Sequence, residues 1–448
     1  MRISCVGAGP AGLYFAIVMK RRNPNHEIVV HERNPAGTTH GWGVVFWDDL
    51  LATLRTNDPD SAQAIADQAV PWSGQVVDVE GQPPHHSVGG GYGICRRRLL
   101  QILIERALAL GVDVRFESEI SELSQVADAD LIVAADGVAS QLRRRRADQF
   151  RPQIEAGRNK YIWLATTQLF PSFTFGFVPT SAGWVWFHAY SFKEGVSTFI
   201  VECAPETWNG LGFGTMLADA ELRVLESIFA KHLDGHELIS RDGNGNRLPW
   251  LSFRTLVNRT WHADNLVLIG DAAHTTHFTI GSGTRLAIDD AVALASALSE
   301  HDSLPRALDA FGHRRHRALA RVQRDARLSA EWFENLPRYI RYNAPAFFTL
   351  LLARRSRLLK RMPARTYLYL RGACTKLTGS AASPLARIGG PVRIKSQPRH
   401  LRSRTGNAPP LTLSATDRAE PDPADAGRPG GRAADEAASG PAPARRAG

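Results

Sequence analysis

The sequence predicts an α/β protein with a largely parallel sheet, into which a smaller antiparallel sheet is inserted. Short apolar runs alternate with helical patterns on either side of residues 160–203, which is typical of parallel sheets covered by helices. Residues 160–203 themselves are rich in aromatic and β-branched residues between Gly and Pro turns, as antiparallel sheets are. The chain has 448 residues, 44% of them hydrophobic, which is enough for several domains with buried cores.

Hydrophobic spacing places the elements in order along the chain. The predicted strands of the parallel sheet span residues 1–6, 26–32, 112–116, 130–135 and 265–270. The predicted helices span residues 12–21 and 99–110, followed by a helix from about residue 283 and long amphipathic helices to about residue 336. This alternation predicts that one sheet is assembled from both ends of the region.

A glycine-rich turn, Gly7-Ala8-Gly9-Pro10-Ala11-Gly12, lies between the first strand and the first helix. Such a turn allows a tight bend, close approach of a pyrophosphate, and packing of the helix on the strand, and the helix N-terminus favours the phosphate charge. Glu32, next to Arg33, stands twenty residues beyond Gly12, where a carboxylate binds a ribose 2′-OH. A purely structural turn with a surface Glu is the alternative, but the strand–turn–helix context favours binding of FAD or NAD.

Three further motifs identify the dinucleotide. Gly270-Asp271 ends a strand ahead of Gly281 and Gly283 at a helix start, Asp136-Gly137 follows another strand, and Arg96 precedes a helix. Together with the glycine turn, they resemble the class A flavin monooxygenases, the single-component aromatic hydroxylases. In that family the Asp of the Gly-Asp motif contacts FAD, and the helix start faces the flavin, where its positive end stabilises negative charge. The alternative is that Gly270-Asp271 belongs to a merely polar turn.

The resemblance implies the fold, the cofactor site and the domains. The fold is a Rossmann-like FAD-binding domain of the glutathione-reductase type, with an inserted antiparallel substrate sheet and C-terminal helices. The implied FAD-binding residues are Gly7, Ala8, Gly9, Pro10, Ala11, Gly12, Glu32, Arg33, Arg96, Asp136, Asp271, Gly281 and Gly283. The FAD-binding domain comprises residues 1–155 and 259–365, the latter with the C-terminal helices, and residues 156–258 form the substrate domain. Residues 366–406 are a basic segment, and residues 407–448, poor in large apolar side chains, are a disordered tail.

The chain departs from most class A enzymes in an informative way. His277-Phe278 stands where most members have two prolines, and Arg285 stands where they have an Asn. These departures, with the strings GWGVVF, RNKYIW, STFIVE and EWFEN, resemble the branch that acts on aryl-CoA thioesters. A related hydroxylase of the violacein pathway, acting on a tryptophan-derived compound, shares some of these strings, so a free aromatic intermediate is the alternative substrate.

The resemblance implies an enzyme with FAD as cofactor and NADH or NADPH as co-substrate. In this family O₂ adds to the reduced flavin, and the C4a-hydroperoxide hydroxylates an electron-rich ring. For the aryl-CoA branch the substrate is salicylyl-CoA or anthraniloyl-CoA, and the site is position 5. A flavoprotein dehydrogenase or reductase, which needs no oxygen, is the alternative from a different class.

His188 and His277 are the candidate catalytic residues. Either could bind a hydroxyl, amino or thioester carbonyl group of the substrate, or help to deprotonate a phenol. A purely structural role is an equal alternative for His188, whereas His277 replaces a proline on the flavin side, which favours function. His274 is expected to order the Gly-Asp turn. No histidine pair has partners at metal-binding spacing, so we predict no metal site.

The positive charge is concentrated near the C-terminus, where residues 351–404 hold fourteen basic and no acidic side chains. Arg354, Arg355, Arg357, Lys360 and Arg361 could line a groove for CoA phosphates. Alternatively, residues 347–362 form one amphipathic helix on the core, on an anionic surface or against a partner. The rest of the chain is nearly neutral, which argues against nucleic-acid binding.

Cysteine usage and hydropathy predict the compartment. The four cysteines form no CxxC pair, and no apolar run reaches the roughly 18 residues of a membrane span. The apolar N-terminus is followed, not preceded, by basic residues, unlike a signal peptide. We therefore expect a cytoplasmic protein with no transmembrane segment.

Overall fold

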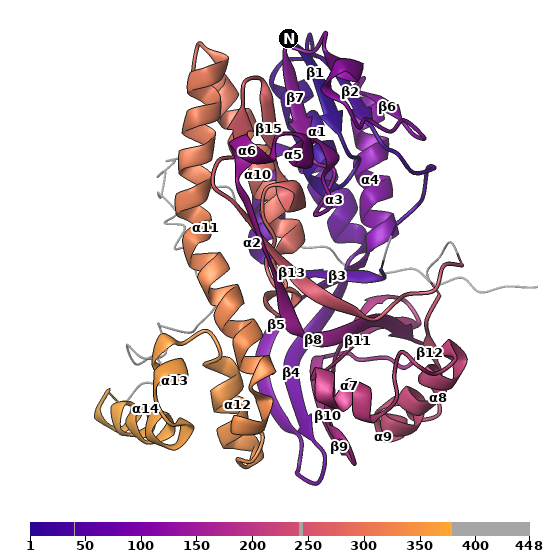
Figure 1. Ribbon diagram of the computed structural model, residues 1–448, viewed down its shortest axis with the longest axis vertical. Helices are drawn as coiled ribbons and strands as arrows, with labels where there is room; N and C mark the ends of the chain where they lie inside the picture. Colours follow the sequence, from indigo (N-terminus) through magenta and orange to yellow (C-terminus); the bar gives the residue numbers. More distant parts are fainter. Residues whose placement is uncertain (40, 242–244, 379–448) are drawn as a thin grey trace, which may run out of the picture. The chain divides into compact units, whose positions relative to one another are not determined.

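Two sheets organise the residues that the computed structural model describes, which are 1–39, 41–241 and 245–378 (Figure 1). The first sheet has the strand order β14-β15-β7-β1-β2-β6 and is parallel except between β14 and β15. Its strands are β1 (Arg2–Val6), β2 (Glu27–His31), β6 (Asp113–Arg115), β7 (Leu131–Ala134), β14 (His262–Ala263) and β15 (Leu266–Leu268). The predicted parallel sheet, assembled from both ends of the region, is confirmed.

Helix α1 (Pro10–Arg22) follows β1 of the parallel sheet and is in contact with α4 (Arg96–Ala109) and α10 (Gly283–Glu300). Residues 11–19 of α1 are all buried, because the helix is apolar nearly all round. Pro10 occupies its first turn, where a missing N–H costs nothing. The helix ends in three basic residues, which suit the negative end of its dipole.

The second sheet follows the order β12-β8-β11-β10-β9-β4-β5-β3, with β13 also paired to β8. All its pairs are antiparallel except β4 with β9. Its strands are β3 (Gly43–Phe46), β4 (Val70–Val79), β5 (His85–Cys95), β8 (Pro152–Thr166), β9 (Phe173–Thr180), β10 (Gly183–Lys193), β11 (Val196–Cys203), β12 (Leu238–Ile239) and β13 (Leu251–Asn258).

Strands β3, β4 and β5 were not expected in this sheet from the sequence. The glycines of β5 conceal its periodicity, but they have a packing reason. A Cβ on Gly93 would lie 2.2 Å from the carbonyl oxygen of Ser191, so only glycine lets β5 approach β10 this closely. The domain boundaries drawn at residues 155, 258 and 365 stay a prediction.

The two faces of the second sheet have different coverings. On one face Val185, Phe187 and Ala189 of β10 join an apolar cluster with residues of α8 (Ala218–Ile228) and α9 (Ala230–Leu233), beside α7 (Pro205–Gly210). On the other face Trp186 packs with residues of α11 (Leu304–Glu334) and α12 (Ala344–Leu352). Alternation along β10 therefore turns His188 toward the α11 side of the sheet.

Helix α11 contacts both sheets, touching β14 of the first and β8 of the second (Figure 1). Residues 347–362 do not form the single helix considered above, because α12 ends at Leu352 and Ser356 caps a separate helix, α13 (Arg357–Arg361). The side chain of Ser356 accepts a hydrogen bond from the Leu359 amide, as an N-cap does. Of the predicted basic segment and tail, only α14 (Ala364–Thr378) falls within the described residues.

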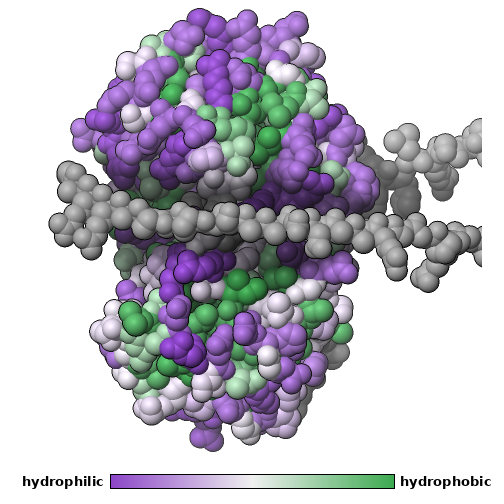
Figure 2. All heavy atoms as spheres, turned by 90° about the vertical axis from the view of Figure 1, so that its right-hand side faces the viewer, coloured by the Kyte–Doolittle hydropathy of each residue, from purple (hydrophilic) through white to green (hydrophobic). Residues whose placement is uncertain are grey.

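The remaining helices are short. They are α2 (Asp48–Asn57), α3 (Pro59–Gln68), α5 (Gln141–Arg145), α6 (Ala147–Phe150) and the 3₁₀ turns η1 (Leu123–Val126), η2 (Gly270–Ala272), η3 (Phe278–Ile280) and η4 (Leu336–Arg338). No helix in the described part of the chain is both long and apolar enough to cross a bilayer. On the face drawn in Figure 2, apolar side chains lie in groups among hydrophilic ones.

Candidate active site

In the glycine-rich turn after β1, close backbone packing requires a glycine at two of the three glycine positions but not at the third. A Cβ on Gly7, where φ is +107°, would lie 2.4 Å from the Ala135 carbonyl oxygen, and one on Gly12 would lie 2.2 Å from the Gly7 oxygen. At Gly9 a Cβ would meet only the Ala135 oxygen, at 3.9 Å. The open side at Gly9 is what close approach of a dinucleotide needs.

Glu32 lies directly after β2 and holds the turn from the other side. Its Oε2 atom accepts a hydrogen bond of 3.0 Å from the Ala8 amide, and its Oε1 atom accepts from the amide and side chain of Asn34. The side chain is half-buried, whereas the neighbouring Arg33 is exposed. The predicted carboxylate is therefore beside the glycine turn.

The second and third motifs meet the first. A Cβ on Gly270 would lie 2.9 Å from the Cβ of Ala11 in α1. The buried Arg143 joins the other two turns, since Nη1 donates to the Ala272 oxygen at 2.9 Å and Nη2 to the Val138 oxygen at 2.5 Å. The motifs, far apart in the sequence, are thus brought to one edge of the parallel sheet.

Two polar groups at this edge lack a partner in the described part of the chain. The Oδ2 atom of Asp136 accepts from the Gln141 amide at 2.8 Å, but its Oδ1 atom is buried and unpaired. Burial raises the pKa of this carboxyl group. The Nε of Arg96 is also buried and unpaired, and burial lowers the pKa of Arg96 while the nearby charge of Asp271 opposes that shift. Asp271 itself is exposed.

The start of α10 completes the edge. Gly281 has φ +62°, and a Cβ there would lie 2.7 Å from Trp47, whereas a Cβ on Gly283 would meet nothing within 4 Å. Gly9 and Gly283 are thus open, and Asp136 and Arg96 have unpaired polar atoms. Open backbone, an unpaired acceptor and an unpaired donor fit the phosphates and hydroxyl groups of FAD.

Asp290 fixes the turn that carries Asp271. This buried carboxylate accepts hydrogen bonds from the Gly270 amide (2.9 Å), from His274 Nε2 (2.8 Å) and from Arg315 Nε (2.6 Å). Burial alone would raise its pKa, but His274 and Arg315 outweigh burial and lower it. His274 is therefore linked through Asp290 to the Gly270 amide, which is consistent with the expected role of His274 in ordering the Gly-Asp turn.

The two candidate catalytic histidines both contact one aromatic ring. Phe278 of η3 has its ring centroid 4.4 Å from that of His277 and 5.8 Å from that of His188. Tyr161 and Phe253 also contact Phe278, at 4.8 and 6.1 Å. We call this group of five residues the aromatic corner.

His277 accepts rather than donates at its Nδ1 atom. The ring nitrogen accepts from the Thr279 amide at 3.4 Å and lies 3.0 Å from the Thr279 hydroxyl. Burial, opposed by Glu202 and reinforced by His188, lowers the pKa of His277 to about 4. Burial likewise lowers the pKa of His188, against the pull of Glu202. These shifts favour the neutral form of both rings, which leaves each with one ring nitrogen able to accept a hydrogen bond.

Glu202 was missed by the sequence reasoning. This carboxylate, 1% exposed, accepts from Asn159 Nδ2 at 2.7 Å and from Trp186 Nε1 at 3.2 Å, and it lies 3.6 Å from His188 Nε2. The only local signal is an acidic residue at the end of the apolar string STFIVEC. Its partners come from β8 and β10, and cross-strand pairing that brings them together cannot be read from local spacing.

The structure brings no metal-binding cluster together within residues 1–39, 41–241 and 245–378. Arg285, the other departure from the class A pattern, lies on α10 and pairs with Asp49 of α2 at 2.6 Å. Its guanidinium is thus held between two helices.

Comparison with known proteins decides the family. The FAD binding domain family matches residues 238–326. Salicyloyl-CoA 5-hydroxylase from a Streptomyces species is 38% identical over 366 residues, covering 80% of this chain and 70% of that protein. This chain belongs to the FAD-dependent aromatic monooxygenases. It is accordingly a flavoprotein that uses FAD together with NAD(P)H.

Two further relatives of this monooxygenase are nearly as similar. A 3-hydroxy-4-methyl-anthranilyl-[aryl-carrier protein] 5-monooxygenase from Streptosporangium sibiricum is 37% identical, over 75% of this chain and 90% of that protein. Protodeoxyviolaceinate monooxygenase from Chromobacterium violaceum is 33% identical, over 80% of this chain and 95% of that protein. Among solved structures, 2-methyl-3-hydroxypyridine-5-carboxylic acid oxygenase shares the fold, with a TM-score of 0.60 at 20% identity, over 75% of this chain and 91% of that one.

Proposed function

We propose that this monooxygenase hydroxylates position 5 of an aromatic ring bound as a CoA thioester, salicyloyl-CoA or anthraniloyl-CoA. Of the relatives named above, one is a 5-hydroxylase of salicyloyl-CoA and another is a 5-monooxygenase of an anthranilyl group on an aryl-carrier protein. The observation that carries the proposal in the structure is the aromatic corner, where two neutral histidines face one ring beside the turns that suit FAD.

The chemistry divides between cofactor and chain. FAD, when bound, takes hydride from NAD(P)H and activates O₂. The chain has to hold the substrate ring, exclude water and manage one proton. In salicyloyl or anthraniloyl thioesters the hydroxyl or amino group at position 2 is para to position 5, so hydrogen bonding or proton loss at that group makes carbon 5 more nucleophilic.

His188 is the residue we assign to that proton. Its neutral ring accepts the substrate proton, while its buried Nε2 atom lies 3.6 Å from Glu202 Oε2. Glu202, fixed by Asn159 and Trp186, then stabilises the charged imidazole. His277, which contacts the same Phe278 ring, orients the ring substituent or the thioester carbonyl group.

The test of the substrate is NAD(P)H oxidation by the purified yellow protein with product masses read in parallel. Salicyloyl-CoA and anthraniloyl-CoA are compared with their free acids and with a tryptophan-derived indole. The proposal predicts fast oxidation and one added oxygen for a thioester only. Hydroxylation of a free acid or of the indole, with no thioester turned over, contradicts it.

The test of the two histidines separates binding of FAD from use of oxygen. His277→Ala is expected to keep bound FAD but to form less hydroxylated product per NAD(P)H consumed. Glu202→Gln is expected to lower the rate of hydroxylation by roughly 100-fold, the low end for loss of acid–base catalysis. An unchanged product yield in His277→Ala and an unchanged rate in Glu202→Gln would remove both residues from the reaction.

A free aromatic intermediate remains the second candidate. It is favoured by the violacein-pathway relative, of which the chain covers 95%. The same assay decides between the candidates, because the indole substrate is one of its arms. Membership of a monooxygenase family sets aside the oxygen-independent dehydrogenase considered from the sequence.

A further inference from the structure

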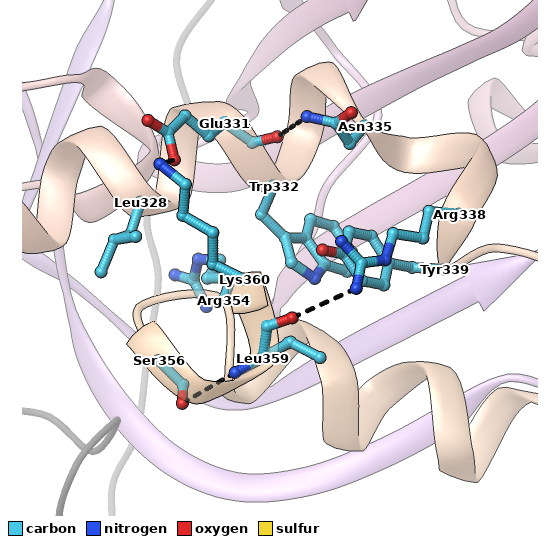
Figure 3. Close-up of a pocket in the computed structure, with 10 residues that line it drawn as sticks. All are labelled: Leu328, Glu331, Trp332, Asn335, Arg338, Tyr339, Arg354, Ser356, Leu359 and Lys360. Carbon is cyan, nitrogen blue, oxygen red and sulfur yellow. Dashed lines mark hydrogen bonds and ion pairs between the residues drawn. The ribbon is translucent and has the colours of Figure 1, made fainter. Parts of the chain in front are cut away.

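A pocket of about 210 Å³ lies between the end of α11 and the segment that enters α13 (Figure 3). One water molecule needs only roughly 10–15 Å³ measured in this way. Glu331, Trp332, Arg338, Tyr339, Arg354 and Lys360 are among the residues that line it. We call it the α11–α13 pocket.

The α11–α13 pocket has an excess of positive charge. Of its three cationic side chains, Lys360 is paired, with its Nζ atom 2.5 Å from Glu331 Oε2. Arg338 and Arg354 have no carboxylate within 4 Å in the part of the chain that the structure describes. Two guanidinium groups without a counter-ion in one pocket favour an anionic ligand.

Arg354 is held in place by neutral acceptors. Its Nε donates to the Ser329 hydroxyl at 3.1 Å, Nη1 to the Leu351 oxygen at 2.9 Å and Nη2 to the Thr279 oxygen at 3.3 Å. Burial and the neighbouring Arg355 lower its pKa to about 9. The geometry orients the guanidinium, but no negative charge of the chain neutralises it.

Trp332 supplies a second unsatisfied donor. Its indole is 3% exposed and stacks on Tyr339 with 4.8 Å between ring centroids. Its Nε1 has no hydrogen-bond partner among the described residues, and the ring stands in the wall of the pocket (Figure 3). A buried N–H group without an acceptor is costly, and a ligand oxygen would satisfy it.

The pocket is connected to the aromatic corner. The Ser329 hydroxyl that accepts from Arg354 lies 2.9 Å from the Thr279 hydroxyl, which lies 3.0 Å from His277 Nδ1. The carbonyl oxygen of Thr279 accepts directly from Arg354. An anion bound by Arg354 would therefore lie close to the segment that carries Phe278 and Thr279.

We propose that the α11–α13 pocket binds the phosphate of a 4′-phosphopantetheine arm, through Arg354, Arg338 and Trp332. This inference rests on the proposed function, because such an arm carries the acyl group both in CoA and on a carrier protein. The phosphate is the chemistry that the two sources share, and it is absent from a free acid and from an indole.

The experiment compares kcat/KM for salicyloyl thioesters of N-acetylcysteamine, 4′-phosphopantetheine, CoA and a phosphopantetheinylated carrier protein. The N-acetylcysteamine thioester, which has no phosphate, is expected to react at least about tenfold less efficiently, since a hydrogen bond to a charged group contributes about 1.5–3 kcal/mol. Arg354→Gln should lower kcat/KM about tenfold more for the phosphorylated substrates than for the N-acetylcysteamine thioester, whose own loss reports any effect through Thr279 and Ser329. The ratio between CoA and carrier protein identifies the natural source.

Two further variants separate charge from folding. Lys360→Gln removes a pocket cation and should lower kcat/KM for the phosphorylated substrates. Glu331→Gln removes the pocket acid and should raise kcat/KM for the same substrates. The matched control is Arg357→Gln, because Arg357 is exposed and lies in the same segment but outside the pocket lining. This variant should change kcat/KM for none of the thioesters.

Two outcomes would overturn the inference in distinguishable ways. Equal kcat/KM for all four thioesters, or an equal loss for all of them in Arg354→Gln, removes the phosphate site and leaves the proposed function standing. No hydroxylation of any thioester removes the proposed function and the pocket inference together.

Discussion

The edge of the parallel sheet and the aromatic corner hold their polar groups in opposite ways. At the edge, most contacts run between backbone atoms and side chains of the motifs themselves, as in the bond from the Ala8 amide to Glu32. Beside the aromatic corner, Glu202 of β11 is instead held by Asn159 of β8 and Trp186 of β10. The comparison teaches that the turns proposed to hold FAD are built from short segments, whereas the residues proposed to act on the substrate depend on the assembled sheet.

The largest expected effect comes from the glycine that the protein does not need for its own packing. Gly9→Ala should fold, because a Cβ there meets only one atom, at 3.9 Å, yet it should lose bound FAD and with it the activity. Gly12→Val should instead fail to fold, because its Cβ would lie 2.2 Å from the Gly7 oxygen. FAD absorbance and thermal unfolding distinguish the two.

The matched control for Gly9 is Gly372→Ala on α14, where a Cβ meets nothing within 4 Å. This variant should keep both fold and FAD. If Gly9→Ala retained stoichiometric FAD, the edge of the parallel sheet would not be the cofactor site, and the comparison between the edge and the aromatic corner would no longer hold.

Asp290 provides the next largest effect. Asp290→Asn leaves Arg315 buried without its carboxylate, so it should lower the free energy of unfolding by about 3–5 kcal/mol. Asp309→Asn, whose carboxylate is 64% exposed and pairs with His262, should cost about 1 kcal/mol or less. Denaturant unfolding of both variants gives the values, and equal losses would contradict the assigned role of Asp290.

The neighbourhood of the turns at the edge of the parallel sheet could be predicted from the sequence, whereas the contacts within the aromatic corner could not. The roles of Gly7, Gly12 and Glu32 follow from local spacing and a βαβ context, so their neighbourhood could be predicted residue by residue. His188 and His277 were chosen as single residues, but their contact through Phe278 depends on how η3 docks on β10. Glu202 could not be found, because its partners are 16 and 43 residues away.

The smallest expected effect is the pH dependence contributed by His277. Its pKa of about 4 in the folded protein lies below the roughly 6.5 of an unfolded histidine, so the folded state binds fewer protons between these values. Stability from this residue is complete above about pH 6.5 and falls as the pH drops toward 4. Between pH 7 and pH 5 the wild type should lose on the order of 2 kcal/mol more than His277→Asn.

Denaturant unfolding of both proteins at the two pH values measures this difference. His188 is retained in the variant, so the difference between the two proteins reports His277 together with its coupling to His188. Parallel pH profiles of the two proteins would mean that His277 is not desolvated in the aromatic corner.

The most direct test of the whole account is turnover of salicyloyl-CoA under ¹⁸O₂ by the FAD-loaded protein, with the product mass and ring position determined together. The account predicts one ¹⁸O atom per product at carbon 5, with NAD(P)H consumed in equal amount. Product without ¹⁸O, or NAD(P)H oxidation that proceeds equally well without the substrate and yields no hydroxylated thioester, would contradict it.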